Sequence, residues 1–150
     1  MSSRFMLPLL AVVASLTVSI AAQTKYGAGV TLQEETPFAR LQSQPNSLEG
    51  MAVRVEASIT SVCTTTPCRW IGIAGTGGSD YGNSVLARVD PGKIEIPKSV
   101  MGKRVTIEGV VASVARDPDP EAKVAAADYG QENPGRPAFW QLKVTGAVVQ

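Results

Sequence analysis

The chain has 150 residues, of which 14 are lysine or arginine, 13 are aspartate or glutamate and none is histidine. This length suits one domain with its own hydrophobic core better than two. The balanced charge, with no basic run, argues against nucleic acid as a partner, because a phosphate backbone needs a basic surface to neutralise it.

Residues 1–22 have the pattern of a secretory signal peptide. Arg4 precedes an apolar run that ends in the small residues Ala21 and Ala22, just before Gln23. We expect cleavage near this point, a periplasmic or secreted location, and no stable membrane insertion afterwards. An uncleaved anchor is the alternative, because the run approaches the roughly 17 residues that a spanning helix needs.

Residues 23–47 are expected to form an N-terminal arm and a short helix. Thr36 and Pro37 suit a helix start, because the hydroxyl can cap free N–H groups and proline needs no donor there. The helix is predicted near 37–44, with Pro45 as its end. We expect it to cover one end of a barrel formed by residues 48–150.

From Gly50 the apolar residues recur with a period of two, which is typical of strands with one buried face. Residues 94–96 are expected to extend the sheet, after a tight turn at 90–92 and before a helical turn over 97–102. In the second long strand the apolar phase shifts at Gly109, where we expect a β-bulge. Strands are predicted near 51–63, 70–74, 85–90, 103–115 and 138–149.

A second helix is predicted near 120–129. Asp119 suits its N-cap, Pro120 its first position, and Gly130 its end. The five strands, with a helical turn between the third and the fourth, match the order of an OB-fold, a five-stranded Greek-key barrel. The predicted fold class is therefore all-β with minor helices, with another small β-sandwich or barrel as the alternative.

Both cysteines lie at the tip of the first hairpin, where Cys63 ends one strand and Cys68 precedes the next. Residues paired across a hairpin lie about 4.5 to 5.5 Å apart, which a disulfide accepts. Export would place them in an oxidising compartment, so we expect a structural disulfide. The alternative is a functional pair that exchanges with thiols or binds Cu(I), with Met51 or Met101 as a further ligand.

OB-fold barrels bind ligands on the face of strands 2 and 3 and on the adjoining loops. In this chain that surface would carry Arg69, Trp70, Tyr81 and Arg88, although Trp70 could equally belong to the core. No pair of residues suggests an acid and base for catalysis. We therefore predict that the protein is not an enzyme and needs no cofactor.

Several motifs resemble a bacterial exported family of OB-fold proteins, known as domain of unknown function 4920. They are the Val62–Cys63 and Cys68 hairpin, Tyr26–Gly27, Gly50-x-x-Val-x-Val, Ile96–Pro97, Val105-x-Ile-Glu-Gly109, Ala127–Asp128–Tyr129–Gly130 and Thr145–Gly146–Ala147–Val148. The family pattern usually has glycine before the second cysteine and tryptophan directly after it, whereas this chain has Pro67 and Arg69. Members also tend to carry a histidine before the last strand, which is absent here.

Two functional hypotheses follow from these observations. The first is an exported OB-fold-like module that binds a protein or another envelope component. The second is a periplasmic accessory protein that handles copper or thiols through Cys63 and Cys68.

Overall fold

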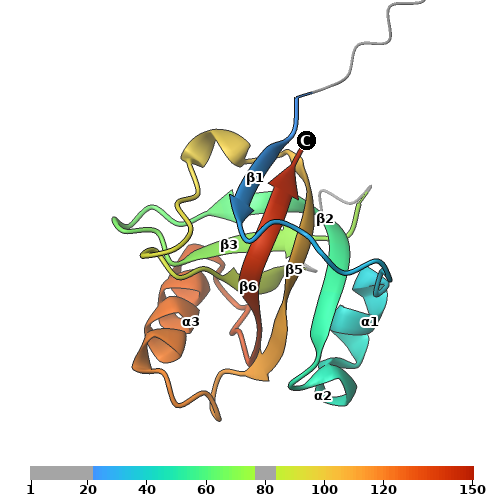
Figure 1. Cartoon of the computed structure of the whole chain (residues 1–150). Coiled ribbons are helices and arrows are strands. Elements are labelled where there is room, and N and C mark those ends of the chain that lie inside the picture. The colour runs from blue at the N-terminus through green and yellow to red at the C-terminus, as the bar shows by residue number, and fades with distance from the viewer. Residues whose placement is uncertain (1–21, 77–83) are drawn as a thin grey trace, which may run out of the picture.

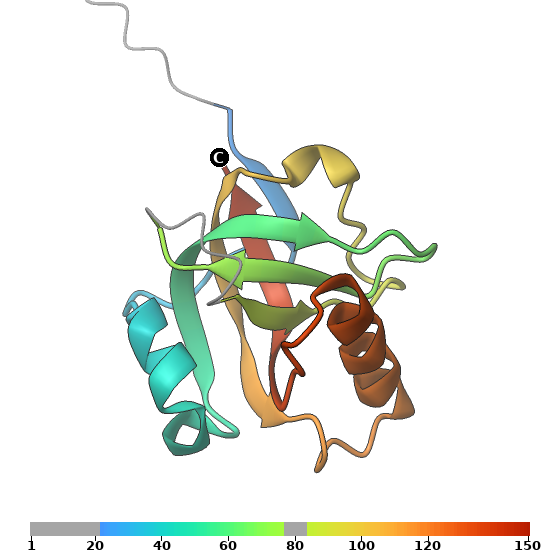
Figure 2. The ribbon, with the colours of Figure 1, turned by 180° about the vertical axis from the view of Figure 1, so that it is seen from behind.

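Five strands close into a barrel in the computed structural model, which describes residues 22–76 and 84–150 (Figures 1 and 2). The strands are β2 (Ala52–Val62), β3 (Trp70–Ala74), β4 (Val85–Arg88), β5 (Arg104–Ser113) and β6 (Trp140–Val149). β3 pairs antiparallel with β2 on one side and with β4 on the other. β4 then pairs parallel with β6, and β6 pairs antiparallel with β5, which returns to β2. This is the strand order of an OB-fold, so the predicted fold class is confirmed.

Alternating burial along the strands explains why these segments form a barrel. In β2 the side chains of Val53, Val55 and Ala57 are buried, while Arg54 and Glu56 lie partly exposed between them. Inward side chains from every barrel strand contribute to one core, as the period of two predicts. The β2–β3 register shifts by one residue near Thr60, which increases the local curvature.

The N-terminal arm adds a sixth strand outside the barrel. β1 (Thr24–Gly27) pairs with the C-terminal half of β6. The arm then passes over β6 at Gly146, where a Cβ atom would collide with the carbonyl oxygen of Gly29. This strand was not predicted, because the arm carries no alternating apolar residues.

Glu108 on β5 (Arg104–Ser113) fastens the next part of the arm. Its carboxylate accepts hydrogen bonds from the N–H groups of Thr31 and Leu32, at 2.7 and 2.9 Å, and from the Thr31 hydroxyl at 3.0 Å. Burial acts to raise the pKa of Glu108, but these bonds outweigh it and hold the pKa below its usual value. The ionised carboxylate therefore ties the arm to the barrel.

Two short helices, α1 (Phe38–Ser43) and α2 (Pro45–Leu48), pack against β2 and β5 (Figure 1). Phe38, Leu41 and Leu48 join the core. The predicted Thr36 cap is wrong: Pro37 occupies the N-cap without a side-chain bond, and the Thr36 N–H donates to the Arg54 carbonyl at 2.7 Å. Pro45 does not simply end a helix, because it also begins α2, where its missing donor costs nothing.

The segment between β4 and β5 differs from the prediction in one respect. The tight turn is present, since the Gly92 N–H donates to the Asp90 side chain at 3.0 Å, and a helical turn, η2 (Lys98–Val100), follows. Residues 94–96, however, form no strand. Ile94 and Ile96 are buried in the core, so the segment is held by packing rather than by a ladder.

Gly109 lies at a bulge, as predicted, but the predicted phase shift within β5 is wrong. The β5–β6 register changes between Glu108 and Gly109, and the extra residue is Thr145 in β6. Burial in β5 keeps its alternation through Gly109. A Cβ atom on Gly109 would collide with the Lys143 carbonyl oxygen, so glycine is required there.

The longest described helix, α3 (Pro120–Glu132), connects β5 to β6 and lies against β3 and β4 (Figures 1 and 2). Asp119 caps it as predicted, accepting from the Glu121 N–H at 3.0 Å. Gly130 does not end it; the helix continues to Glu132, where Asn133 caps the Tyr129 carbonyl. Within residues 22–76 and 84–150, no helix has the length and apolarity to cross a membrane.

Candidate functional site

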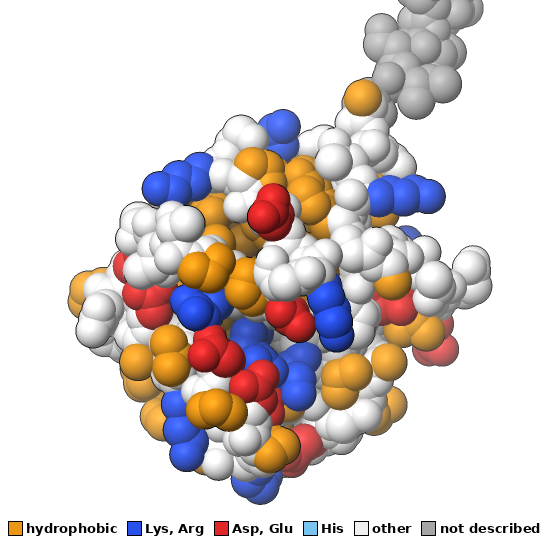
Figure 3. Space-filling view, turned by 60° about the vertical axis from the view of Figure 1, so that its left-hand side comes forward, with side chains coloured by type: hydrophobic (Ala, Val, Ile, Leu, Met, Phe, Trp, Pro, Cys, Tyr) orange, Lys and Arg blue, Asp and Glu red, His pale blue; other side chains and the backbone are white. Residues whose placement is uncertain are grey.

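Two of the predicted ligand-binding residues, Arg69 and Arg88, line a hollow of about 610 Å³, which we call the charged hollow. Acidic and basic side chains interleave on this face, as Figure 3 shows. The charged lining residues are Arg69, Arg88, Asp90, Lys93, Asp119, Glu121 and Lys143. The hollow therefore gathers residues from the loop before β3, from β4, β5 and β6, and from the start of α3.

Asp117 is the centre of this charge network. Its side chain is fully buried. It lies 3.3 Å from both Arg88 and Lys143 and accepts a hydrogen bond from the Gln141 amide at 2.8 Å. Burial acts to raise the pKa of Asp117, but bonds from the Asp119 N–H and Lys143, with the nearby positive charges, hold it below the usual value. Asp117 therefore stays ionised at neutral pH.

The other charges of the hollow are paired in the same way. Arg88 donates to Asp119 at 2.7 Å, and this bond is the largest cause of the lowered pKa of Asp119. Arg69 forms an ion pair with Glu121. Lys93 lies 3.8 Å from Asp90, and both side chains are largely exposed. Every basic residue of the hollow thus has an acidic neighbour, an arrangement that fastens α3 to the barrel.

Trp70 belongs to the core and not to a ligand-binding surface in this structure. It is fully buried, its indole N–H donates to Asp128 at 2.7 Å, and its ring meets Tyr129 edge-on at 5.2 Å. Leu86 and Ala125 complete this second cluster between α3 and the barrel. Tyr81 lies outside the described residues.

The predicted disulfide is present. Cys63 and Cys68 are bonded, with their Cα atoms 5.6 Å apart. The intervening loop also contacts α3: the Thr64 N–H donates to Glu132 at 3.1 Å, and the Thr65 hydroxyl to Asp128 at 3.3 Å. The loop that carries the disulfide therefore helps to hold α3 in place.

The copper hypothesis needs two free thiolates, which the bonded pair does not offer. Met51 precedes β2 while Cys63 follows its far end, so the 11-residue strand separates them. Among the described residues, no group of three or more histidine, cysteine, aspartate or glutamate side chains could hold a metal ion.

α3 occupies the surface that OB-folds use for ligands. That surface consists of the second and third barrel strands, here β3 and β4, with the loops after the first and fourth strands. The loop after the fourth barrel strand, β5, contains α3. It binds the loop after the first barrel strand, β2, through Arg69–Glu121, Thr64–Glu132 and Thr65–Asp128. Trp70 and Leu86, on β3 and β4, are covered by the helix. A ligand would have to displace α3 to reach this face.

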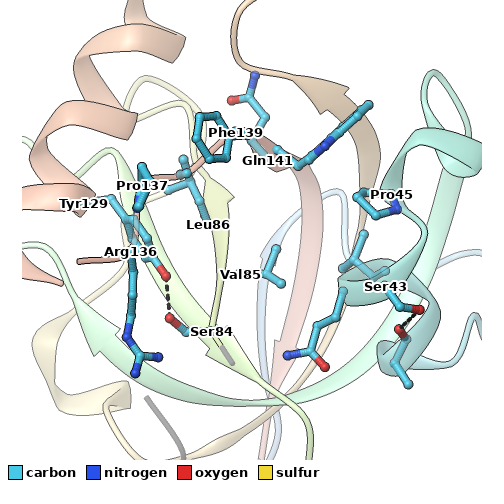
Figure 4. Close-up of a pocket in the computed structure, with 15 residues that line it drawn as sticks. Ser43, Pro45, Ser84, Val85, Leu86, Tyr129, Arg136, Pro137, Phe139 and Gln141 are labelled. Carbon is cyan, nitrogen blue, oxygen red and sulfur yellow. Dashed lines mark hydrogen bonds between the residues drawn. The ribbon is translucent and has the colours of Figure 1, made fainter. Parts of the chain in front are cut away.

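A second hollow, of about 540 Å³, lies between α1 and the start of β6. We call it the Phe139 groove, after the most exposed of its large hydrophobic side chains. Phe139 is 72% exposed. Figure 4 shows Phe139, Pro137 and Tyr129 along one side, Val85 between the two sides, and Pro45 and Ser43 on the other side. The groove is mainly apolar and opens to solvent.

Two polar features mark one end of the Phe139 groove. The Tyr129 and Ser84 hydroxyls are hydrogen-bonded to each other, and Arg136 runs past them (Figure 4). Burial raises the pKa of Tyr129, so the phenol stays neutral at physiological pH. Arg136 is exposed and forms no ion pair with any residue in the described ranges.

The groove was not predicted from the sequence. Residues 131–137 lie between the predicted second helix and the predicted last strand, and Phe139 lies at the edge of that strand. Phe139 shares the polar phase of Gln141 and Lys143 in the predicted strand, but Gln141 is fully buried in the structure, so this phase does not identify Phe139 as exposed.

No family model and no curated protein matches the sequence. Among solved structures, an aspartyl-tRNA synthetase from Leishmania major matches with 20% identity and a TM-score of 0.46, over 79% of this chain and 21% of that protein. An aspartyl-tRNA synthetase from Entamoeba histolytica gives 12% and 0.46, over 77% of this chain and 21% of that one. The asparaginyl-tRNA synthetase from Pyrococcus horikoshii gives 14% and 0.45, over 79% and 23%. The chain thus spans about a fifth of these proteins, and its fold assignment rests on its own strand order.

Proposed function

We propose that this protein is an exported interaction module that binds a segment of a partner protein in the Phe139 groove. The observation that carries the proposal is Phe139 itself, which is 72% exposed at the wall of an apolar hollow. Holding a large aromatic ring in water has a free-energy cost of about 1.5 to 3 kcal/mol relative to burying it. Exposed aromatic residues beside a concave apolar surface are typical of binding sites.

The covered OB face supports this choice of surface. A ligand on β3 and β4 would have to break the Arg69–Glu121 pair and separate Trp70 from Tyr129. The Phe139 groove needs no such rearrangement, because Phe139 and Val85 already face open space (Figure 4). A partner can therefore enter the groove at a lower free-energy cost than the face of β3 and β4.

We also propose that the chain is a divergent member of the exported family known as domain of unknown function 4920. The order of the resembling motifs from Tyr26 to Val148 supports this membership. The signal-peptide pattern of residues 1–22 supports export. The Cys63–Cys68 disulfide is consistent with an oxidising compartment.

Intact mass tests export directly. The protein is expressed from its full sequence in a bacterial host and recovered from the periplasm and the membrane fraction. We expect a soluble periplasmic species that begins near Ala22 or Gln23. A species that keeps Met1 and stays in the membrane fraction would contradict the proposal.

Site-specific photo-crosslinking tests the groove. A photoreactive phenylalanine analogue replaces Phe139 in one variant and Val124 in a control, because Val124 is also exposed, at 50%, but lies on α3 away from the groove lining. On irradiation in cells of the source organism, the variant at position 139 should form a discrete crosslinked species that the variant at position 124 does not form. Equal crosslinking from both positions, or none from either, would overturn the proposal.

A further inference from the structure

The charge inside the Phe139 groove is not balanced, in contrast to the charged hollow. None of the described residues that line the groove is acidic. Arg136 is the only basic one among them, and it forms no ion pair within the described part of the chain. The groove therefore has one positive charge that no carboxylate of the described residues balances, and a carboxylate of another molecule could pair with it.

We propose that the occupant of the groove is an extended peptide segment of another protein that combines apolar side chains with a carboxylate bound by Arg136. This inference rests on the proposed function and specifies the chemistry of the partner. The carboxylate would be an aspartate or glutamate side chain of the segment.

The arrangement of the lining fits such a segment. Apolar contacts would come from Phe139, Trp140 and Val85, and the volume of about 540 Å³ falls within the usual range of roughly 300 to 1,000 Å³ for binding pockets. Arg136 lies at one end, beside the Tyr129–Ser84 hydrogen bond (Figure 4). A guanidinium group binds a carboxylate through two parallel hydrogen bonds, which also fixes the direction of the peptide.

The shape of the groove favours a peptide over a lipid with the same carboxylate. An acyl chain is held best where apolar walls surround it, whereas Phe139 is 72% exposed and the groove is open to solvent. A peptide can leave its polar backbone in water while its apolar side chains enter the hollow. The occupant that matches both the open side and the single positive charge is therefore an acidic, apolar peptide.

A peptide-binding assay on the purified mature protein tests the inference. Bead-bound tetrapeptides carry Leu, Val, Phe or Pro at three positions and Asp, Asn or Lys at the first or the last position. The wild-type protein should bind the Asp set at least about tenfold more strongly than the Asn set, the gain usual for a hydrogen bond to a charged group. Arg136→Gln should remove this preference, and Arg136→Glu should reverse it in favour of Lys.

Two controls separate the groove from general charge. Arg40→Gln removes an exposed arginine of α1 that does not line the groove, so it should leave the Asp preference intact. Phe139→Ser should weaken binding of all three peptide sets, because it removes the shared apolar contact. An Arg40→Gln effect equal to that of Arg136→Gln would overturn the role of Arg136.

The outcomes distinguish this inference from the proposed function. If the Asp, Asn and Lys sets bind equally and Phe139→Ser abolishes this binding, the proposed contact between Arg136 and a carboxylate is wrong, while the groove remains a binding site. No binding of any set would overturn the tetrapeptide chemistry, and crosslinking at position 139 would still decide the proposed function. Displacement of the Asp peptides by micromolar dodecanoate would identify a lipid as the occupant and overturn the peptide.

Discussion

The charged hollow and the Phe139 groove have similar volumes, about 610 and 540 Å³, but opposite relations to the rest of the molecule. In the charged hollow each basic residue has an acidic neighbour. The single carboxylate of Asp117 contacts Arg88, Lys143 and Gln141. In the groove, an aromatic ring is exposed and Arg136 has no described acidic partner. The two hollows therefore differ in whether the described residues balance their charges, and not only in how many charges they contain.

The largest expected effect comes from Asp117→Asn. The change leaves Arg88 and Lys143 beside a buried amide, and removing one partner of a buried ion pair costs about 3 to 5 kcal/mol. Urea unfolding should show a loss of about 3 kcal/mol in the free energy of unfolding. Asp90→Asn is the control, because Asp90 is an exposed acid of the same hollow, and it should change stability by about 0.5 kcal/mol or less. Equal effects of the two substitutions would show that the network is not what holds α3.

Reduction of Cys63–Cys68 should have the next largest effect. Closing a loop of this size removes about 2 kcal/mol of conformational freedom from the unfolded chain. The reduced protein should melt several degrees lower, and amide exchange should quicken in the second half of α3, which Thr64 and Thr65 hold. The β2–β5 ladder is the internal control and should exchange as before. An unchanged melting temperature after complete reduction would show that the disulfide does not stabilise the fold.

Acid should weaken the charged hollow before it affects the groove. Asp117 and Asp119 have pKa values in the folded protein below those of the unfolded chain, about 3.9. Their contribution to stability is therefore complete above the unfolded value and is lost as the pH falls through the folded pKa values. Chemical unfolding between pH 5 and pH 3 should show a decline that Asp117→Asn makes shallower. A decline of equal slope in that variant would assign the effect to other carboxyls, such as Glu108.

The smallest effects are expected from the groove itself. Phe139 and Arg136 are both exposed, so Phe139→Ser and Arg136→Gln should each change the free energy of unfolding by about 0.5 kcal/mol or less. Thermal and urea unfolding of both variants beside the wild type would measure this. If Phe139→Ser were to cost more than about 2 kcal/mol, a value typical of core residues, the ring would be structural and the comparison between the two hollows would fail.

The strands could be predicted because the alternation of apolar and polar residues within each segment shows which of its side chains are buried. Val53, Val55 and Ala57 alternate with polar residues, and this alternation identified β2 to within one residue at each end. Ile94 and Ile96 show the limit of the pattern, since they alternate in the same way but are buried without a strand partner. Periodicity reports which side chains are buried and not whether the backbone is paired.

The candidate sites depend on contacts between distant parts of the chain. Arg69 was predicted to face a ligand, yet its partner is Glu121, which lies 52 residues further along. Arg88 likewise meets Asp117 and Asp119 in the loop before α3. No local pattern could show that α3 folds back over β3 and β4. The same long connection builds the wall of the groove with Tyr129 and Arg136, which explains why that site was missed.

The crossing of the N-terminal arm over β6 has a consequence for recognising relatives of this protein. Gly146 faces the backbone of Gly29 so closely that any larger residue would force the arm away, and Gly109 meets the Lys143 carbonyl in the same manner. A distant homologue could replace most of the core with other apolar residues and still fold. It could not replace these two glycines and keep both the arm and the bulge. Glycine at positions 109 and 146 is therefore a requirement that relatives with this arm and this bulge should share, however far the rest of their sequences diverge.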